Sequence, residues 1–143
     1  MRPSTKCRLA INGMLELASM RPSKPLSMAF LAKKQSIFLS YLEQVFSSLR
    51  RAGLVKSVRG PGGGYLLSRA ADDITTGQII SALERDEQAV LSESSLEDCE
   101  RLGEERRIET FWSNMRVHVI DLYDRVSLQD LIDEKSWPHK ESL

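Results

Sequence analysis

Arg59-Gly60-Pro61-Gly62-Gly63-Gly64-Tyr65 is the stretch that decides the fold of this chain. It holds four of the eight glycines and lies between two short apolar runs, Leu54–Val58 and Tyr65–Leu67. An apolar run, a tight turn of glycine and proline, and a second apolar run are typical of a β-hairpin. The sequence therefore predicts a hairpin with an arginine at its lip and a tip of nearly bare backbone.

An amphipathic helix is predicted immediately before the hairpin, over Leu39–Ala52, and is stopped by Gly53. Its apolar residues recur at helical spacing and form one stripe, made of Leu42, Val45, Phe46 and Leu49. Two further helices are predicted upstream, over Thr5–Met20 and Met28–Lys34. A helix followed by a basic hairpin is the arrangement of a winged helix-turn-helix domain, in which the helix enters the major groove of DNA.

The polar side chains of the Leu39–Ala52 helix lie wholly or partly off its apolar stripe. They are Ser40, Tyr41, Glu43, Gln44, Ser47, Arg50 and Arg51. Side chains of these types can reach base edges and phosphates, so a recognition face is predicted. The alternative is an ordinary solvated helix face.

Charge is divided unequally along the chain, although the formal net charge is zero. Residues 1–70 carry twelve Lys and Arg against two acids, Glu16 and Glu43. Residues 71–143 carry the remaining eight basic and eighteen acidic residues. An asymmetry of this size indicates a polyanionic partner for the basic half, with two ordinary solvated surfaces as the alternative.

The second half is predicted to contain a short helix over Ile74–Leu83, an acidic mobile loop over Glu87–Glu105 and a longer helix. In that longer helix apolar residues alternate at spacings of four and three: Ile108, Trp112, Met115, Val119, Leu122 and Val126. Such a seam is predicted to pack against a second copy of the chain, with packing onto its own domain as the alternative. Ser127–Ile132 is predicted to be a capped final turn or a short helix.

These patterns predict a mainly α fold with a small β-hairpin wing: a winged helix-turn-helix domain over residues 1–84, an acidic loop over 85–105, a dimerisation helix and terminal segment over 106–132, and a tail over 133–143. No apolar run approaches the roughly 20 residues that a membrane span needs, and no secretory signal is evident, so a cytoplasmic protein is predicted. The glycine-rich turn lacks a Gly-Lys-Ser/Thr ending, and no catalytic set is found, so no enzyme is predicted.

The segment SYLEQVFSSLRRAGLVKSVRGPGGGYLL, the opening MRPSTKCRLAINGMLELA and the stretch TGQIISALE closely resemble the iron–sulfur cluster regulator (IscR) type of winged-helix transcription factor. The resemblance implies a homodimer, acting as a repressor, that binds palindromic promoter sites on double-stranded DNA. It places DNA contacts on Arg2, Ser4, Lys6, Ser40, Tyr41, Glu43, Gln44, Arg50, Arg59, Gly60 and Pro61.

Three departures from that family stand out. Ser36 lies in the turn of the helix-turn-helix where the family commonly has glycine, and we expect some strain there. Phe38 replaces a small polar residue that can cap the next helix. Cluster-bearing members of the family hold an iron–sulfur cluster with three closely spaced cysteines and a histidine. In this chain Cys99 is the only cysteine within residues 90–112, and Glu109 stands at the histidine position.

We therefore expect no cluster and no other cofactor. Two alternatives to this expectation stay open. Cys99, with carboxylates such as Glu97, Asp98 or Glu100, would make the protein a redox- or metal-responsive regulator. A winged-helix adaptor that binds proteins rather than DNA is the alternative from another class.

Overall fold

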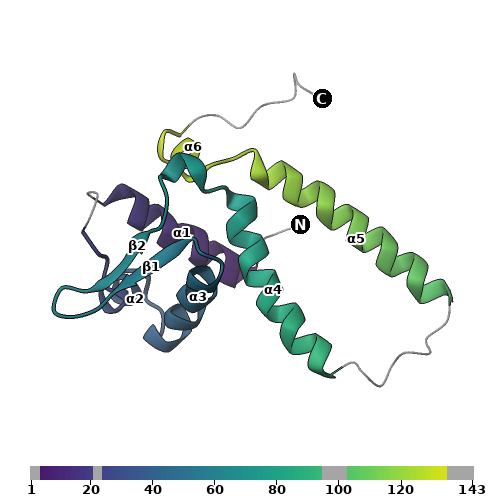
Figure 1. The fold of residues 1–143 in the computed structure, drawn as a ribbon, viewed down its shortest axis with the longest axis horizontal. Coiled ribbons are helices and arrows are strands. Elements are labelled where there is room, and N and C mark those ends of the chain that lie inside the picture. The colour runs from purple at the N-terminus through teal and green to yellow at the C-terminus, as the bar shows by residue number, and fades with distance from the viewer. Residues whose placement is uncertain (1–3, 21–23, 95–102, 135–143) are drawn as a thin grey trace.

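The computed structural model describes residues 4–20, 24–94 and 103–134 of the chain. Helices and one short hairpin account for its regular structure (Figure 1). In chain order the elements are α1 Thr5–Ser19, α2 Met28–Gln35, α3 Leu39–Arg51, β1 Val55–Val58, β2 Gly64–Leu67, the 3-10 turn η1 Ala71–Asp73, α4 Thr76–Ser94, α5 Gly103–Asp124 and α6 Leu128–Ile132. The predicted fold class, mainly α with a small hairpin, is confirmed.

The first three helices enclose an apolar core centred on α3. Its predicted stripe is fully buried, and Phe46 on that stripe packs its ring 5.3 Å from the ring of Tyr65 on β2. Serine side chains begin the first two helices as N-caps: Ser4 Oγ accepts from the Cys7 amide at 3.2 Å, and Ser27 Oγ accepts from the Phe30 amide at 3.4 Å. Capping supplies acceptors to amides that the helix leaves unpaired, which fixes where each helix begins.

The hairpin is held against the helical core by a third segment of chain. β1 and β2 pair antiparallel, with Val55 opposite Leu67 and Val58 opposite Gly64. Leu26 exchanges two backbone hydrogen bonds with Tyr65, each 3.0 Å long. A side chain at Gly64 would overlap the carbonyl oxygen of Leu26, so only glycine allows this close approach. The hairpin is therefore fixed relative to α1 and α2.

The turn between α2 and α3 has the strain that its sequence predicts. Ser36 ends α2 in the left-handed conformation, with φ 55° and ψ 45°. Phe38 occupies the N-cap position of α3 and makes no side-chain cap hydrogen bond. The backbone still begins the helix there, because the Phe38 carbonyl accepts from the Leu42 amide at 3.2 Å.

α4 is longer than the sequence predicts. The expected short helix over Ile74–Leu83 continues to Ser94, and α5 already begins at Gly103, so the predicted loop over Glu87–Glu105 is wrong at both ends. The segment after Leu83 contains glutamate, arginine, glutamine, alanine and leucine, which are good helix formers. The middle of the predicted loop, residues 95–102, lies outside the described residues.

The end of α5 is joined to the beginning of α4 by hydroxyl and backbone hydrogen bonds. Thr75 Oγ1 donates to Asp124 Oδ1 at 2.6 Å, and Thr76 Oγ1 donates to the Tyr123 carbonyl at 2.7 Å. The Thr76 amide donates to the Val126 carbonyl at 2.9 Å. This threonine joint (Thr75 and Thr76 with Tyr123, Asp124 and Val126) leads into α6, whose N-cap Ser127 forms a capping box with Asp130.

The joint corrects one prediction about the seam. Val126 was expected to continue the dimer interface, but α5 ends at Asp124 and Val126 is only 7% exposed. The chain has already turned back toward the domain at that point. Val126 therefore stabilises the attachment of α5 instead of facing a second chain.

Candidate DNA-binding surface

The exposed side of α3 carries most of the polar residues of the predicted recognition face, whereas Ser47 is half-buried. Ser40, Tyr41, Glu43, Gln44 and Arg50 are exposed, opposite the buried stripe. Burial of that stripe fixes the rotation of the helix about its axis, so the five side chains share one side. Hydroxyl, amide, carboxylate and guanidinium groups are the types that bond base edges and phosphates.

The hairpin turn presents Arg59, Gly60 and Pro61 to solvent, as predicted. The turn is closed by a hydrogen bond of 2.9 Å from the Gly63 amide to the Gly60 carbonyl. Arg59 has no ion-pair partner within the part of the chain that the structure describes. Its guanidinium is therefore available to a phosphate or a groove.

The N-terminal residues have more mixed positions. Ser4 is exposed, but its hydroxyl oxygen already accepts from Cys7 as the cap of α1. Lys6 is half-buried and has an interaction partner. Arg2 lies outside the described residues. As DNA contacts these three residues stay predictions.

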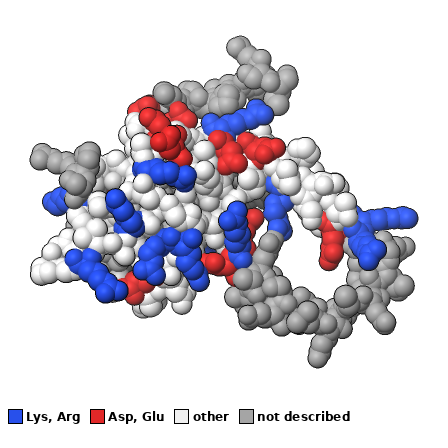
Figure 2. All heavy atoms as spheres, in the orientation of Figure 1, with Lys and Arg blue, Asp and Glu red and all other residues white. Residues whose placement is uncertain are grey.

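Basic side chains gather over the part of the molecule formed by α2, α3 and the hairpin, whereas acidic ones gather over α6 (Figure 2). Several of these cations are exposed and form no ion pair with any described residue: Lys24, Lys33, Arg50, Lys56 and Arg59. The sequence does not distinguish Lys24, Lys33 and Lys56 from the other basic residues of the first half. The overall asymmetry of charge is the signal that could have found them.

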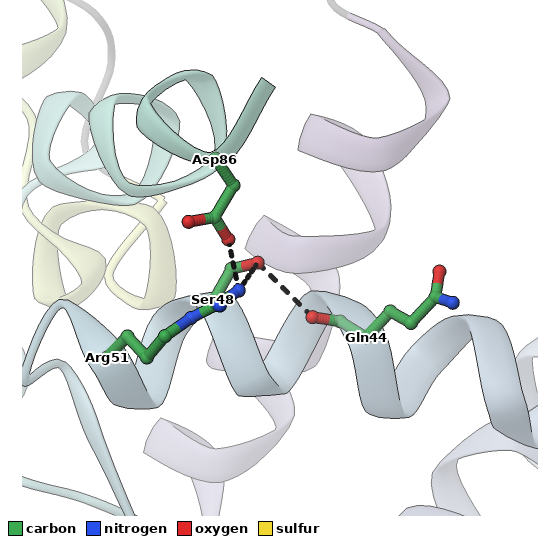
Figure 3. Close-up of polar contacts among 4 residues, drawn as sticks. All are labelled: Gln44, Ser48, Arg51 and Asp86. Carbon is green, nitrogen blue, oxygen red and sulfur yellow. Dashed lines mark hydrogen bonds and ion pairs between the residues drawn. The ribbon is translucent and has the colours of Figure 1, made fainter. Parts of the chain in front are cut away.

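Arg51 differs from its neighbour Arg50 in being tied to another helix. Its Nη2 lies 2.6 Å from Asp86 Oδ2 on α4 and 3.5 Å from Ser48 Oγ, which itself donates to the Gln44 carbonyl at 3.2 Å (Figure 3). Asp86 therefore draws this guanidinium from α3 toward α4. Of the two arginines at the end of α3, Arg50 is the one that has no ion-pair partner among the described residues.

A second surface lies on α5 and is apolar. Ile108, Met115 and Leu122 are exposed, Trp112 is 61% exposed, and Val119 is half-buried. Phe111 widens this surface, with its ring 5.3 Å from that of Trp112 in an edge-to-face arrangement. Large contiguous apolar patches on one chain mark sites of association.

The donors for an iron–sulfur cluster do not come together in the described residues. No group of three or more His, Cys, Asp or Glu side chains there could hold a metal ion. Cys7 packs against the core from the first turn of α1, and Glu109 is exposed on α5. Cys99 lies outside the described residues. A single remaining thiol does not fit the thiolate-rich set by which proteins hold such clusters.

Comparison with known proteins agrees with this geometry. The model of the Rrf2 family, described as an iron-dependent transcriptional regulator, matches residues 3–134. The HTH-type transcriptional regulator IscR of Pectobacterium carotovorum is 38% identical over 135 residues, which cover 94% of this chain and 81% of that protein.

Solved structures extend the comparison to the fold. CymR, the global cysteine regulator of B. subtilis, superposes with a TM-score of 0.68 at 36% identity and covers 95% of this chain and 99% of its own. IscR of T. potens superposes with a TM-score of 0.67 at 30% identity, over 94% and 88%. Among the described residues, no helix is long and apolar enough to cross a bilayer.

Proposed function

Because the chain belongs to the Rrf2 family of DNA-binding transcription regulators, we propose that it is a homodimeric repressor of a palindromic promoter site. The observation that carries this proposal is the exposed side of α3, which lies on the same half of the molecule as exposed cations that form no ion pair with any described residue. Such a surface attracts the phosphate backbone and offers side chains that select bases. The protein acts where promoter DNA is, in the cytoplasm.

The cationic side chains and the polar side chains of α3 have different roles in DNA binding. Lys33, Arg50 and Lys56 supply affinity that depends on salt and is nearly independent of sequence, because they neutralise phosphates, and Arg59 either joins them or reads a base. Ser40, Tyr41, Glu43 and Gln44 supply sequence choice by bonding base edges in the major groove. The acidic second half keeps α4 to α6 off the DNA and so orients the molecule.

Dimerisation follows from the apolar surface of α5. A second copy of the chain buries Trp112, Met115 and their neighbours, and it does so symmetrically, since the same surface serves both subunits. A two-fold dimer presents two copies of α3 to one duplex, which selects a palindromic site. A dimer bound to such a site within a promoter blocks the access of the transcription machinery to that promoter and so represses transcription.

We further propose that the regulator works without the cluster held by related regulators. The donor set supports this, because Cys99 is the only thiol between α4 and α5. Protein purified without oxygen should be colourless, and iron chelation should leave DNA binding unchanged. A coloured protein that loses its colour and changes its DNA affinity on oxidation would contradict this proposal.

The direct test of DNA binding is substitution at the hairpin. Arg59→Ala should weaken binding to a selected site by about 1–3 kcal/mol if Arg59 reads a base, or weaken all sequences nearly equally if it contacts only phosphate. Arg125→Ala, which removes an exposed arginine beyond α5, is the matched control and should bind as wild type does. Equal binding by wild type and Arg59→Ala in gel shifts at moderate salt would refute the role of the hairpin. Failure of the wild type to bind any duplex would favour the protein adaptor instead.

A further inference from the structure

The ring of Phe38 stands at the leading end of α3 and is 83% exposed. Its position is fixed by the backbone on both sides. Ile37 packs against the core, while the Phe38 carbonyl accepts the first helical hydrogen bond, from Leu42. The chain is extended at Phe38, with φ −66° and ψ 131°. The side chain after the half-buried Ile37 therefore points outward, because successive side chains alternate in extended backbone.

Nothing within the described residues uses this ring. It lies in neither of the two aromatic pairs, and it gives α3 no cap, which a serine, threonine or aspartate at the same position would supply. An exposed apolar side chain contributes favourable free energy only when a partner removes its surface from water. Its surroundings identify the chemistry of that partner.

Leu39, which follows Phe38 directly, is itself 40% exposed, but the other exposed neighbours in sequence are polar or basic. The exposed Ser40 and Tyr41 follow Phe38 on α3, and Lys33, exposed and unpaired among the described residues, precedes it in the last turn of α2. Such a setting suits a polyanion that carries a small apolar feature, rather than an apolar protein surface. DNA offers one such feature in the major groove, the 5-methyl group of thymine.

We propose that Phe38 contacts the methyl group of a thymine and adds a thymine preference to each half-site. The inference rests on the proposed entry of α3 into the major groove, where the N-terminal residues of a recognition helix contact base edges. An exposed phenylalanine at the helix start is then an apolar reader beside the hydrogen-bonding residues Ser40, Tyr41, Glu43 and Gln44.

The test removes the methyl group from the DNA and the ring from the protein, separately and together. Duplexes selected from a random library by the wild-type protein are remade with 2′-deoxyuridine in place of each thymine in turn. At one position in each half-site, the replacement should make the duplex bind the wild type about fourfold more weakly. This is the effect of losing one buried methyl group. For Phe38→Ala the same replacement should have no effect.

Two further variants serve as controls. Phe30→Ala removes the other exposed phenylalanine of the helix-turn-helix and should keep the fourfold effect. Phe38→Leu keeps an apolar side chain and should keep part of it. A selected site with no methyl-sensitive thymine, or a sensitivity that persists in Phe38→Ala, would overturn the inference and leave the proposed function standing; the ring would then serve a protein partner or none. A wild type that selects no site would overturn both.

Discussion

Ser36→Gly should stabilise the protein, because Ser36 holds a left-handed backbone that suits glycine. The substitution changes little else. Ser36 is exposed, and its hydrogen bonds at the end of α2 are donated by its backbone amide. Glycine has the same amide, so the substitution keeps these hydrogen bonds. The two terms to compare are the backbone strain relieved in the folded state and the chain freedom gained by the unfolded state.

The strain term is the larger of the two. A side chain in the left-handed region costs about 1–2 kcal/mol. Replacing it with glycine loosens the unfolded chain and removes about 0.4–1 kcal/mol of stability. The expected net gain is roughly 0.5–1 kcal/mol, which raises the melting temperature by a few degrees in a chain of about this size.

Gly53→Ala provides the control with the opposite sign. Gly53 has φ 76°, and a Cβ built there meets no atom within 4 Å, so the substitution tests backbone strain alone. It should lower stability by about 1 kcal/mol. Both variants are compared with wild type by urea denaturation at one protein concentration, followed by circular dichroism. The reasoning fails if Ser36→Gly leaves the free energy of unfolding unchanged or lower while Gly53→Ala behaves as expected.

Three further predictions concern assembly and binding. Met115→Asp with Val119→Asp should give monomers, because it places unpaired charge in the α5 surface at a cost of several kcal/mol; sedimentation that still shows a dimer would place the interface elsewhere. Glu43→Ala should broaden the sites selected from random DNA without lowering affinity, since a carboxylate accepts from cytosine N4 and repels phosphate; an unchanged consensus would make Glu43 a bystander. Asp86→Asn should release Arg51 and steepen the salt dependence of binding by up to about 0.9 per subunit; an equal slope in titrations of both proteins would show that Arg51 reaches no phosphate.

The parts of the fold that depend on local sequence could be predicted. The glycine-rich turn specifies its hairpin within a few residues, and the buried stripe of α3 follows from helical spacing alone. The same stripe places Ser40, Tyr41, Glu43 and Gln44 on the exposed side. Strain at Ser36 is expected only from the resemblance, because the family commonly has glycine there, and glycine is the residue that a left-handed position favours.

Features that depend on distant residues could not be predicted. The spacing of the seam continues to Val126, but the Thr75–Asp124 hydrogen bond joins residues 49 positions apart and redirects the chain first. The Arg51–Asp86 pair spans 35 positions, so the sequence does not distinguish Arg51 from Arg50. The length of α4 does not follow from composition, because an acidic and polar segment is typical of a loop, whereas glutamate also favours a helix.

Because α5 is long, a small rotation at the threonine joint displaces its far end by a much larger distance. The helix has 22 residues and is therefore about 33 Å long, and hydrogen bonds hold one of its ends to the first turn of α4. A tilt of about 5° at that end moves the other end by about 3 Å, close to the rise of one base pair. In a dimer built on α5, the joint in each subunit thus contributes to the distance between the recognition helices. A tilt too small to alter the fold of either subunit would then be enough to change the spacing of the recognition helices, so that it no longer matches the spacing of the half-sites.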